Sequence, residues 1–395
     1  MKMFLKVWVY ISIVVLIVLV CSCRSDVVGS NAIVEDIPVI ELLIGESKRV
    51  QVIDEYVDRV VRVKLDSDVA NKIGDFSKFF TSSDNKFILV DEWAGVITCI
   101  NTDGEIMYSI ESGGDPRTNF PVIEICHYDK INKQILVNDG AHIYTYDDDG
   151  SFVSKRAKEN FNYLYRHTVS KDDVLYTVQN EYQFTSGVHR QVVWEKNGVL
   201  NGDFLNELPF MPSGIGIRGF SEFHELDGKL YYHSTLRDTF YDVKLPNFIP
   251  AFTVNFIGKE STDNILRNGK IENKLNYLMR EAIPFVVDAG VGDDKVFISY
   301  RRVGDSYVAL YDRKKGEVVF NGQYVRCENF IFQAPLLYDN GVFMRMFSDD
   351  EVAVYDVFGD KEELEDDDVV RLHKAREQSA DSGDKYIYLV YASGN

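Results

Sequence analysis

The amino-acid sequence predicts an all-β fold: a six-bladed β-propeller of four-stranded antiparallel blades, with a short helical insertion near the C-terminus. A polar turn pair followed by an alternating apolar run occurs six times, at intervals of roughly 40 to 66 residues. A tight glycine turn recurs at a later place within four of these units. A pair of unrelated β-sandwiches would also contain many short strands, but it does not predict the same order of turns six times.

Each blade is expected to begin with a turn pair that leads into its second strand. The turn pairs are Asp84-Asn85, Asn132-Lys133, Asp172-Asp173, Asp227-Gly228, Asp293-Asp294 and Asn340-Gly341. The strands expected after them are Phe87–Val90, Ile135–Val137, Val174–Val178, Leu230–His233, Val296–Tyr300 and Val342–Met346. The glycine turns, which should join the third strand to the fourth, are Asp103-Gly104, Asp149-Gly150, Asn197-Gly198 and Lys315-Gly316.

A propeller has to close its ring, since an open ring exposes unpaired strand edges. Val60–Leu65 is the expected closing strand, because it precedes the first blade and reads as a strand. Near the other end of the chain, Glu362–Asp368 is acidic, Val369–Gln378 reads as a helix and Lys385–Tyr391 reads as a strand. We expect that strand in blade six with the helix as an insertion, although the sequence leaves a partial seventh blade open.

The amino terminus has the layout of a bacterial signal peptide. Lys2 and Lys6 precede the apolar run Val7–Val20, which is shorter than the roughly 20 residues that a membrane-spanning helix needs. Val20-Cys21-Ser22-Cys23 resembles a lipobox, which predicts a lipid on the sulfur of Cys23 and cleavage before it. An uncleaved amino-terminal anchor is the alternative, and both predict a tether to a membrane.

Composition and charge set the domain organisation and exclude several classes of protein. The chain has 395 residues, 45% of them hydrophobic, which excludes disordered, collagen-like and multi-pass membrane proteins. A formal net charge of -19 excludes a nucleic-acid partner, because phosphate binding needs a basic surface. The predicted organisation is a signal peptide at 1–22, a lipidated leash and lead-in at 23–48, and a single propeller domain at 49–395.

Several segments are typical of one known family of propellers: Val60–Leu65, Ile73-Gly74, Phe87–Asp91, Ile100–Gly104, Gly113–Phe120, Lys229–Tyr232 and Asp238–Tyr241. They give the chain a resemblance to the six-bladed NHL-like β-propeller lipoproteins of Gram-negative gut anaerobes. It covers roughly residues 35–392 and implies a lipid-anchored protein of the Gram-negative cell envelope, in the outer membrane, with its periplasmic or surface face left open. Thr118 and Asn119 stand where the family commonly has a glycine and an acid, which weakens any binding role carried over to that loop.

Several residue patterns suggest chemistry that their context does not support. Gly214, Gly216 and Gly219 match a dinucleotide-binding pattern, but prolines precede them and a strand-like segment follows where a helix is required. Asp147–Gly150 lacks the ligand spacing of a calcium loop and reads as a hairpin tip. The sequence therefore predicts no catalytic residue, no cofactor and no metal ligand.

The cysteines beyond Cys23 are Cys99, Cys126 and Cys327, an odd number at wide spacing. This pattern does not indicate a disulfide framework. All three are expected to be small buried hydrophobes.

The best candidate site is a group of cationic and aromatic side chains on the loops that a propeller gathers at one face. The ligand-binding candidates are Trp93, Arg117, Arg218, Arg237, Arg301 and Arg302, with Tyr182 and Phe184 nearby. Arginine forks bind carboxylate or sulfate groups, and aromatic rings stack on sugars. The alternative is that these arginines pair with the abundant Asp and Glu side chains between blades.

Two functions follow from this candidate site. The first is a membrane-anchored extracytoplasmic lipoprotein whose propeller is a binding or scaffold module for a partner protein or an anionic glycan. The alternative is a glycan lyase or hydrolase acting at the mouth of the propeller channel. Catalysis requires an acid and a base with shifted pKa values, and the sequence offers no such pair at a defined spacing. The binding module is therefore the favoured function.

Overall fold

The computed structural model describes residues 37–43, 50–65, 67, 70, 77–82, 86–157, 165–171, 174–179, 192–196, 199–204, 221–226, 229–234, 238–259, 284–291, 294–302, 305–328, 330–334, 336–339, 341–358, 361–378 and 384–392. All of them except Ile37 belong to the compact unit Pro38–Asn395. This unit therefore begins before residue 49, where the sequence placed the start of the propeller.

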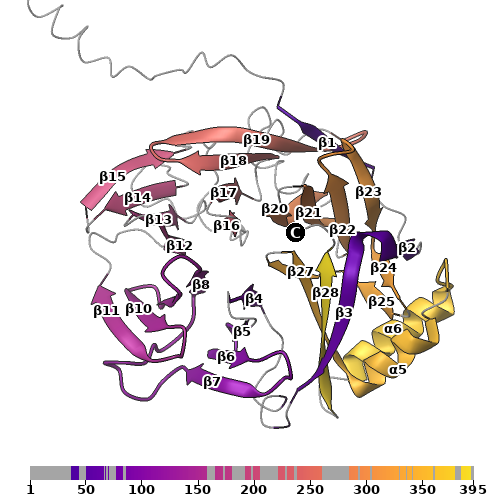
Figure 1. Ribbon diagram of the computed structural model, residues 1–395, viewed down its shortest axis with the longest axis horizontal. Helices are drawn as coiled ribbons and strands as arrows, with labels where there is room; N and C mark the ends of the chain where they lie inside the picture. The colour runs from indigo at the N-terminus through magenta and orange to yellow at the C-terminus, as the bar shows by residue number, and fades with distance from the viewer. Residues whose placement is uncertain are drawn as a thin grey trace, which may run out of the picture. The chain divides into compact units, whose positions relative to one another are not determined.

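Six antiparallel sheets form the six blades, which can be followed in chain order in Figure 1. Blade one contains β4 (Lys78–Thr81), β5 (Phe87–Asp91), β6 (Val96–Ile100) and β7 (Ile106–Glu111). Blade two contains β8 (Ile125–Asp129), β9 (Gln134–Asn138), β10 (His142–Asp147) and β11 (Phe152–Ala157). Blade three contains β12 (Tyr165–Lys171), β13 (Val174–Gln179), β14 (Val192–Lys196) and β15 (Val199–Phe204).

The second half of the ring is built in the same way, with strands added from the amino-terminal segment. Blade four contains β16 (Ser221–Leu226), β17 (Lys229–Ser234), β18 (Thr239–Lys244) and β19 (Asn247–Phe256), to which β1 (Val39–Leu42) adds a fifth strand. Blade five contains β20 (Phe285–Val291), β21 (Lys295–Arg302), β22 (Asp305–Asp312) and β23 (Glu317–Gly322). Blade six contains β26 (Leu337–Asp339), β27 (Val342–Ser348), β28 (Lys385–Ala392) and β3 (Val57–Lys64).

The predicted fold class is confirmed. Each of the six strands expected after a polar turn pair is the second strand of its blade, from β5 in the first blade to β27 in the last. Contacts between the first strands of neighbouring blades join blades two to six in chain order, and a contact between β26 and β4 returns to blade one.

The hydrophobic cores lie between neighbouring blades rather than within them. One core joins Val90 and Ile97 of blade one to Tyr128 and Val137 of blade two. Others join blade four to blade five, blade five to blade six, and blade six to blade one. Inner strands such as β5 and β9 are buried on both faces, which explains why their apolar runs are nearly continuous.

The ring closes in blade six, as the sequence predicts. The amino-terminal strand β3 pairs antiparallel with β28 over Lys64↔Tyr386 to Val57↔Ala392. Two arginines on β3 lie over tyrosine rings of β28: Arg59 is 4.3 Å from the Tyr391 centroid and Arg62 is 4.1 Å from that of Tyr386. These cation–π contacts add to the backbone ladder that holds the closing strand.

The residues before β3 form a strap that links blades four, five and six. β1 pairs parallel with β19, and β2 (Val50–Val52) pairs parallel with β24 (Tyr324–Cys327), which forms a hairpin with β25 (Phe330–Gln333). A single helical turn, η1 (Asp54–Tyr56), leads into β3. Between β1 and β2, the side-chain amide of Asn321 in β23 donates to the carbonyl of Leu43. The segment expected as a lead-in is therefore partly built into the propeller.

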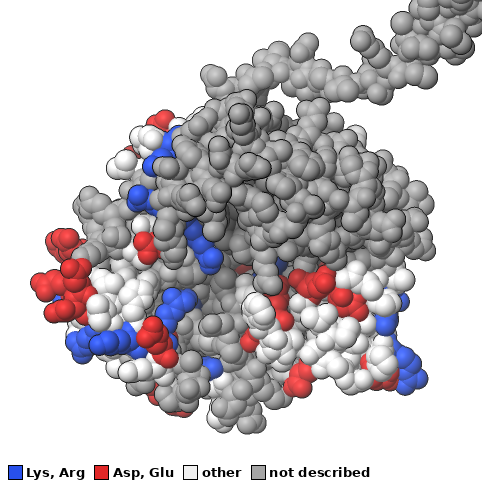
Figure 2. Space-filling model, turned by 180° about the vertical axis from the view of Figure 1, so that it is seen from behind, with Lys and Arg blue, Asp and Glu red and all other residues white. Residues whose placement is uncertain are grey.

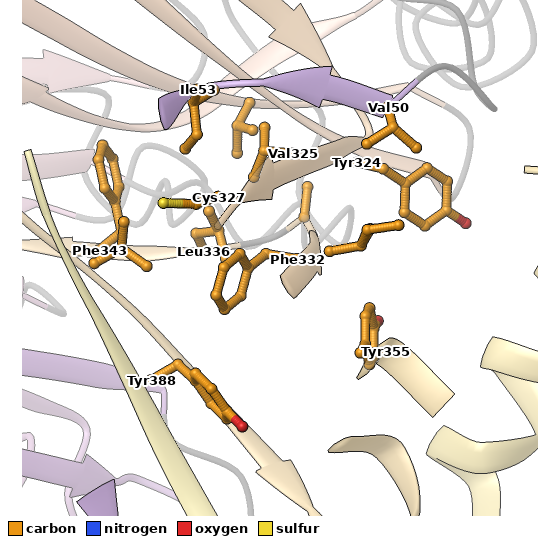
Figure 3. Packing of buried hydrophobic residues seen from close by; sticks show 14 of the residues in the cluster. Val50, Ile53, Tyr324, Val325, Cys327, Phe332, Leu336, Phe343, Tyr355 and Tyr388 are labelled. Atoms are coloured by element: carbon orange, nitrogen blue, oxygen red, sulfur yellow. The ribbon is translucent and has the colours of Figure 1, made fainter. Parts of the chain in front are cut away.

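The insertion in blade six contains two helices, α5 (Asp349–Phe358) and α6 (Asp366–Gln378), of which the sequence predicted only the second. Ser348 and Glu351 cap the start of α5 reciprocally, since each side chain accepts the other's backbone N–H. Figure 3 shows how Tyr355 of α5 and Tyr388 of β28 lie around the core formed by β2 and the β24–β25 hairpin. The insertion thus extends the core between blades five and six.

The described residues form two α-helices, α5 and α6. Neither is long and apolar enough to cross a membrane.

Candidate functional site

The strand order fixes which loops share a face of the ring. In an antiparallel blade the turn between the second and third strands lies at the same end as the connection to the next blade. We call this side the junction face. The turns between the third and fourth strands, such as 101–105 and 313–316, lie on the opposite side, the hairpin face.

The topology places four of the six candidate residues at the junction face. Trp93 lies between β5 and β6, Arg117 lies between β7 and β8, and Arg301 and Arg302 end β21. Arg218 and Arg237 lie outside the described residues, as do Tyr182, Phe184 and Cys23.

Trp93 stands on a tight turn that is held from several sides. Asp91, which is buried, accepts the backbone N–H of Ala94 at 2.8 Å. Gly95 has a φ of 69°, and its carbonyl accepts the backbone N–H of Ser112 at 2.8 Å. An added Cβ at Gly95 would lie 2.3 Å from the Ser112 hydroxyl, so the turn requires glycine here. The Trp93 side chain is nevertheless 83% exposed.

Arg117 lies on the connection from blade one to blade two, which also has a defined conformation. The carbonyl of Asp115 accepts the backbone N–H groups of Thr118 and Asn119, and Gly113 donates to the Phe120 carbonyl at 2.8 Å. From blade two, the Tyr146 hydroxyl donates to the Thr118 carbonyl at 2.7 Å. The loop is therefore tied both to itself and to the neighbouring blade.

The guanidinium of Arg117 already has a carboxylate partner in its own loop. Its Nε lies 3.0 Å from Asp115 Oδ1 and its Nη2 lies 2.6 Å from Oδ2. This contact lowers the pKa of the Asp115 carboxyl and raises the pKa of the Arg117 guanidinium. The pair is exposed, with 84% of the Arg117 side chain accessible. Arg117 is thus paired with an acid, but that acid lies two residues away in the same loop and not between blades, as the alternative considered from the sequence expects.

Arg301 and Arg302 are adjacent in the sequence, but their side chains do not project from the same face of the sheet. Both belong to β21, where Arg301 is opposite Ser306 and Arg302 is opposite Asp305 of β22. Consecutive side chains of a strand point to opposite faces of the sheet. Arg301 is exposed and Arg302 is half-buried. The two arginines therefore project from opposite faces of blade five, although both sit at its junction-face end.

Figure 2 shows positively and negatively charged side chains interspersed among the described residues of the visible face. No group of three or more His, Cys, Asp or Glu side chains within the described residues could hold a metal ion. The acidic segment 147–150 is a hairpin tip, as predicted: Asp148 accepts the Tyr128 hydroxyl at 2.8 Å and pairs with Lys86 at 3.4 Å. The ion pair between Asp148 and Lys86 joins this hairpin of blade two to blade one.

The three cysteines expected to be buried are all buried and free. Burial raises the pKa of the Cys99 thiol to about 11 and that of Cys327 to about 12, and it raises the pKa of Cys126 as well. Thiols in this state are protonated at neutral pH and do not act as nucleophiles. They serve as core residues.

A polar cluster that the sequence did not predict lies where the first strands of three blades end. Asp339 at the end of β26 accepts the backbone N–H and the hydroxyl of Thr81, both at 2.6 Å, and pairs with Lys130 at 2.8 Å. Thr81 ends β4 and Lys130 follows β8, so one carboxylate links blades six, one and two. Nearby, burial lowers the pKa of His127 to about 3, with Lys78 and Lys130 adding to the effect. His127 is therefore neutral at neutral pH, and this cluster stabilises the ring where its ends meet.

Comparison with known proteins agrees with this architecture. The family model described as DUF5128, 6-bladed beta-propeller, matches residues 38–331. No curated protein matches the chain. The fold is similar to that of a Bacteroides fragilis protein named as exported, with a TM-score of 0.63, 14% identity and coverage of 90% of this chain and 100% of that one. It is also similar to a DUF4221 family member from Bacteroides vulgatus, with a TM-score of 0.52, 9% identity and coverage of 85% and 96%.

Proposed function

Because the chain belongs to the DUF5128 family of six-bladed β-propellers, we propose that it is a lipid-anchored extracytoplasmic binding module. Its junction face binds an anionic glycan or a partner protein. The observation that carries the binding role is that Trp93, the Asp115–Arg117 pair and Arg301 are all exposed on that face. Arg301 supplies the cation for an anionic ligand in a chain of formal net charge -19. An acidic protein repels anions over most of its surface, so arginines at one face would be needed to admit an anionic ligand.

The lipid anchor rests on the amino-terminal sequence. Lys2 and Lys6, the apolar run Val7–Val20 and the cysteine at position 23 fit a lipoprotein signal peptide of a Gram-negative bacterium. The likeness to a Bacteroides protein named as exported supports the same compartment. The outer membrane is the proposed site of anchoring, and which side of it the propeller occupies stays open.

Replacing the predicted lipidated cysteine tests the anchor directly. Cys23→Ala is expected to leave an unprocessed precursor, because processing requires the diacylglyceryl group on that sulfur. Palmitate labelling of cells that express the parent or the variant is the measurement, and Cys21→Ala is the matched control. Equal labelling of Cys23→Ala and the parent would disprove lipidation at this residue.

The arginines of blade five test the anionic ligand. A charge-assisted bidentate contact contributes about 1.5 to 3 kcal/mol, so Arg301→Ala with Arg302→Ala should weaken binding of a sulfated or uronate oligosaccharide more than about tenfold. Because the two side chains project from opposite faces of the blade, each single variant is measured as well. Calorimetric titration of the full-length protein gives the affinities.

Lys314 and Lys315 provide the charge-matched control for this experiment. They are two adjacent cations of the same blade, exposed on the hairpin face, where Lys314 makes only a surface ion pair with Asp294. Lys314→Ala with Lys315→Ala should leave the affinity unchanged. If both double variants weaken binding equally, the ligand responds to net charge and the junction face has no special role. A turnover assay on any glycan that binds tests the lyase or hydrolase alternative.

A further inference from the structure

Trp93 differs from the other exposed apolar residues of the molecule. Within the described part of the chain it is the one aromatic side chain among the large hydrophobic residues that are exposed. An exposed indole offers a large flat face on which a ligand can stack. Trp93 lies on a turn of the junction face and not on an outer strand.

The backbone of the turn that carries Trp93 is held by several hydrogen bonds. The buried carboxylate of Asp91 fixes the backbone at Ala94, and the hydroxyl of Ser77 accepts the backbone N–H of Glu92 at 3.4 Å. Gly95 is fastened to Ser112, the residue at which the next loop begins. A rigid platform loses little conformational entropy when a ligand covers it. The backbone on both sides of Trp93 is therefore preorganised.

The loop that is hydrogen-bonded to this turn carries exposed hydrogen-bonding groups. Asp115 and Arg117 lie on the loop that starts at Ser112, and both are exposed. Their mutual pair uses Nε and Nη2 of the guanidinium and leaves Nη1, with two N–H donors, outside it. The carboxylate keeps lone pairs that accept further hydrogen bonds. This loop can therefore both donate and accept, while the two charges cancel.

A flat aromatic ring on one loop, with a neutralised donor and acceptor pair on the loop bonded to it, provides the groups that a neutral sugar needs. The C–H groups of a pyranose carry partial positive charge and stack on the negative face of an indole. Adjacent hydroxyls of the same sugar can accept from a guanidinium and donate to a carboxylate. A sulfate or carboxylate would instead compete with Asp115 for Arg117. The residues flanking Trp93 are Glu92 and Ala94, which do not supply the apolar surround of a protein hot spot.

We infer that Trp93, with Asp115 and Arg117, forms a subsite for a neutral pyranose of a glycan. This inference rests on the proposed function and divides its junction face into two parts. The blade-one subsite stacks an uncharged sugar, and the blade-five arginines take the anionic group.

The experiment uses the full-length protein in a detergent without a sugar headgroup, because a maltoside would itself compete. Neutral hexasaccharides of glucose, mannose, xylose and galactose are titrated while acrylamide quenching of tryptophan fluorescence is followed. At least one sugar is expected to bind saturably and to protect Trp93, since Trp194 is already buried and Trp8 lies in the signal peptide that the proposed processing removes. Trp93→Ala should weaken that binding about tenfold or more, Trp93→Phe should retain much of it, and Asp115→Ala with Arg117→Ala should weaken it too.

Two controls separate this subsite from the rest of the proposal. Met107→Ala removes another exposed apolar side chain, on an outer strand, and should change nothing. Arg301→Ala with Arg302→Ala should leave neutral-sugar binding intact. If no hexasaccharide binds up to about 10 mM, or if Trp93→Ala binds as the parent does, the subsite is disproved. Binding of the sulfated or uronate glycan through the blade-five arginines would then still stand, and its loss would disprove the proposed function separately.

Discussion

Removal of residues 1–69 is expected to abolish stable folding. The deletion takes away β1, β2 and the closing strand β3, and so exposes the edge of β28. It also removes buried side chains from three of the cores between blades, namely Ile40, Leu42, Val50, Ile53, Val63 and Leu65. At about 1.5 to 3 kcal/mol for each, the loss matches or exceeds the whole stability of a typical domain, about 5 to 15 kcal/mol. We expect aggregation, or a melting temperature far below that of the parent.

Removal of residues 1–36 is the matched control, because it leaves β1, β2 and the closing strand β3 in place. Its thermal unfolding, followed by circular dichroism, should coincide with that of the propeller in the full-length chain. A third variant that starts at residue 46 loses only β1 and should fall between the two. Matching melting curves for the deletions at 36 and 69 would show that β3 is not needed to close the ring.

The blades could be predicted because their signals are local. Each second strand, such as Phe87–Val90, is an apolar run that follows a polar turn, so its existence can be recognised without knowledge of distant residues. The strap could not be predicted in the same way. β1 and β2 pair with strands far away in the chain, and a short apolar run such as Val39–Leu42 does not identify its partner.

The missed helix illustrates a different limit. Residues 352–358 read as an apolar run with several valines, which favours a strand over a helix. The sequence did contain a start signal, because Ser348 and Glu351 have the spacing of a capping box. Packing of Val352, Tyr355 and Phe358 on the core then outweighs the strand propensity of the valines.

The face of the ring on which the candidate residues lie could be predicted from the sequence, but the contacts of their side chains could not. The order of turns assigns Trp93 and Arg117 to the same face of the ring without any structure. Strand alternation alone could have shown that Arg301 and Arg302 project from opposite faces of blade five. The contact of Asp339 with Lys130 could not have been found, because it depends on how three blades meet.

A side chain at Gly290 is expected to destabilise the seam between blades five and six. An added Cβ on this β20 residue would lie 1.7 Å from Cε1 of Tyr338 in β26, far inside van der Waals contact. The Tyr338 ring cannot easily retreat, since it stacks on Phe297 at 5.2 Å and packs against Phe343 at 5.0 Å. Gly290→Ala should therefore cost about 1 to 3 kcal/mol, and Gly290→Val more, although valine favours strands. Urea unfolding measures the change in the free energy of unfolding.

A double variant identifies the tyrosine ring as the source of that cost. Tyr338→Ala alone should destabilise the protein, because it removes a packed ring and leaves a cavity. In that background the clash is absent, so adding Gly290→Ala should cost much less than it does in the parent. The two substitutions are thus expected to be coupled by about 1 kcal/mol or more. Additive effects would mean that glycine is required at position 290 for a backbone reason, and that close approach of the two inner strands does not explain it.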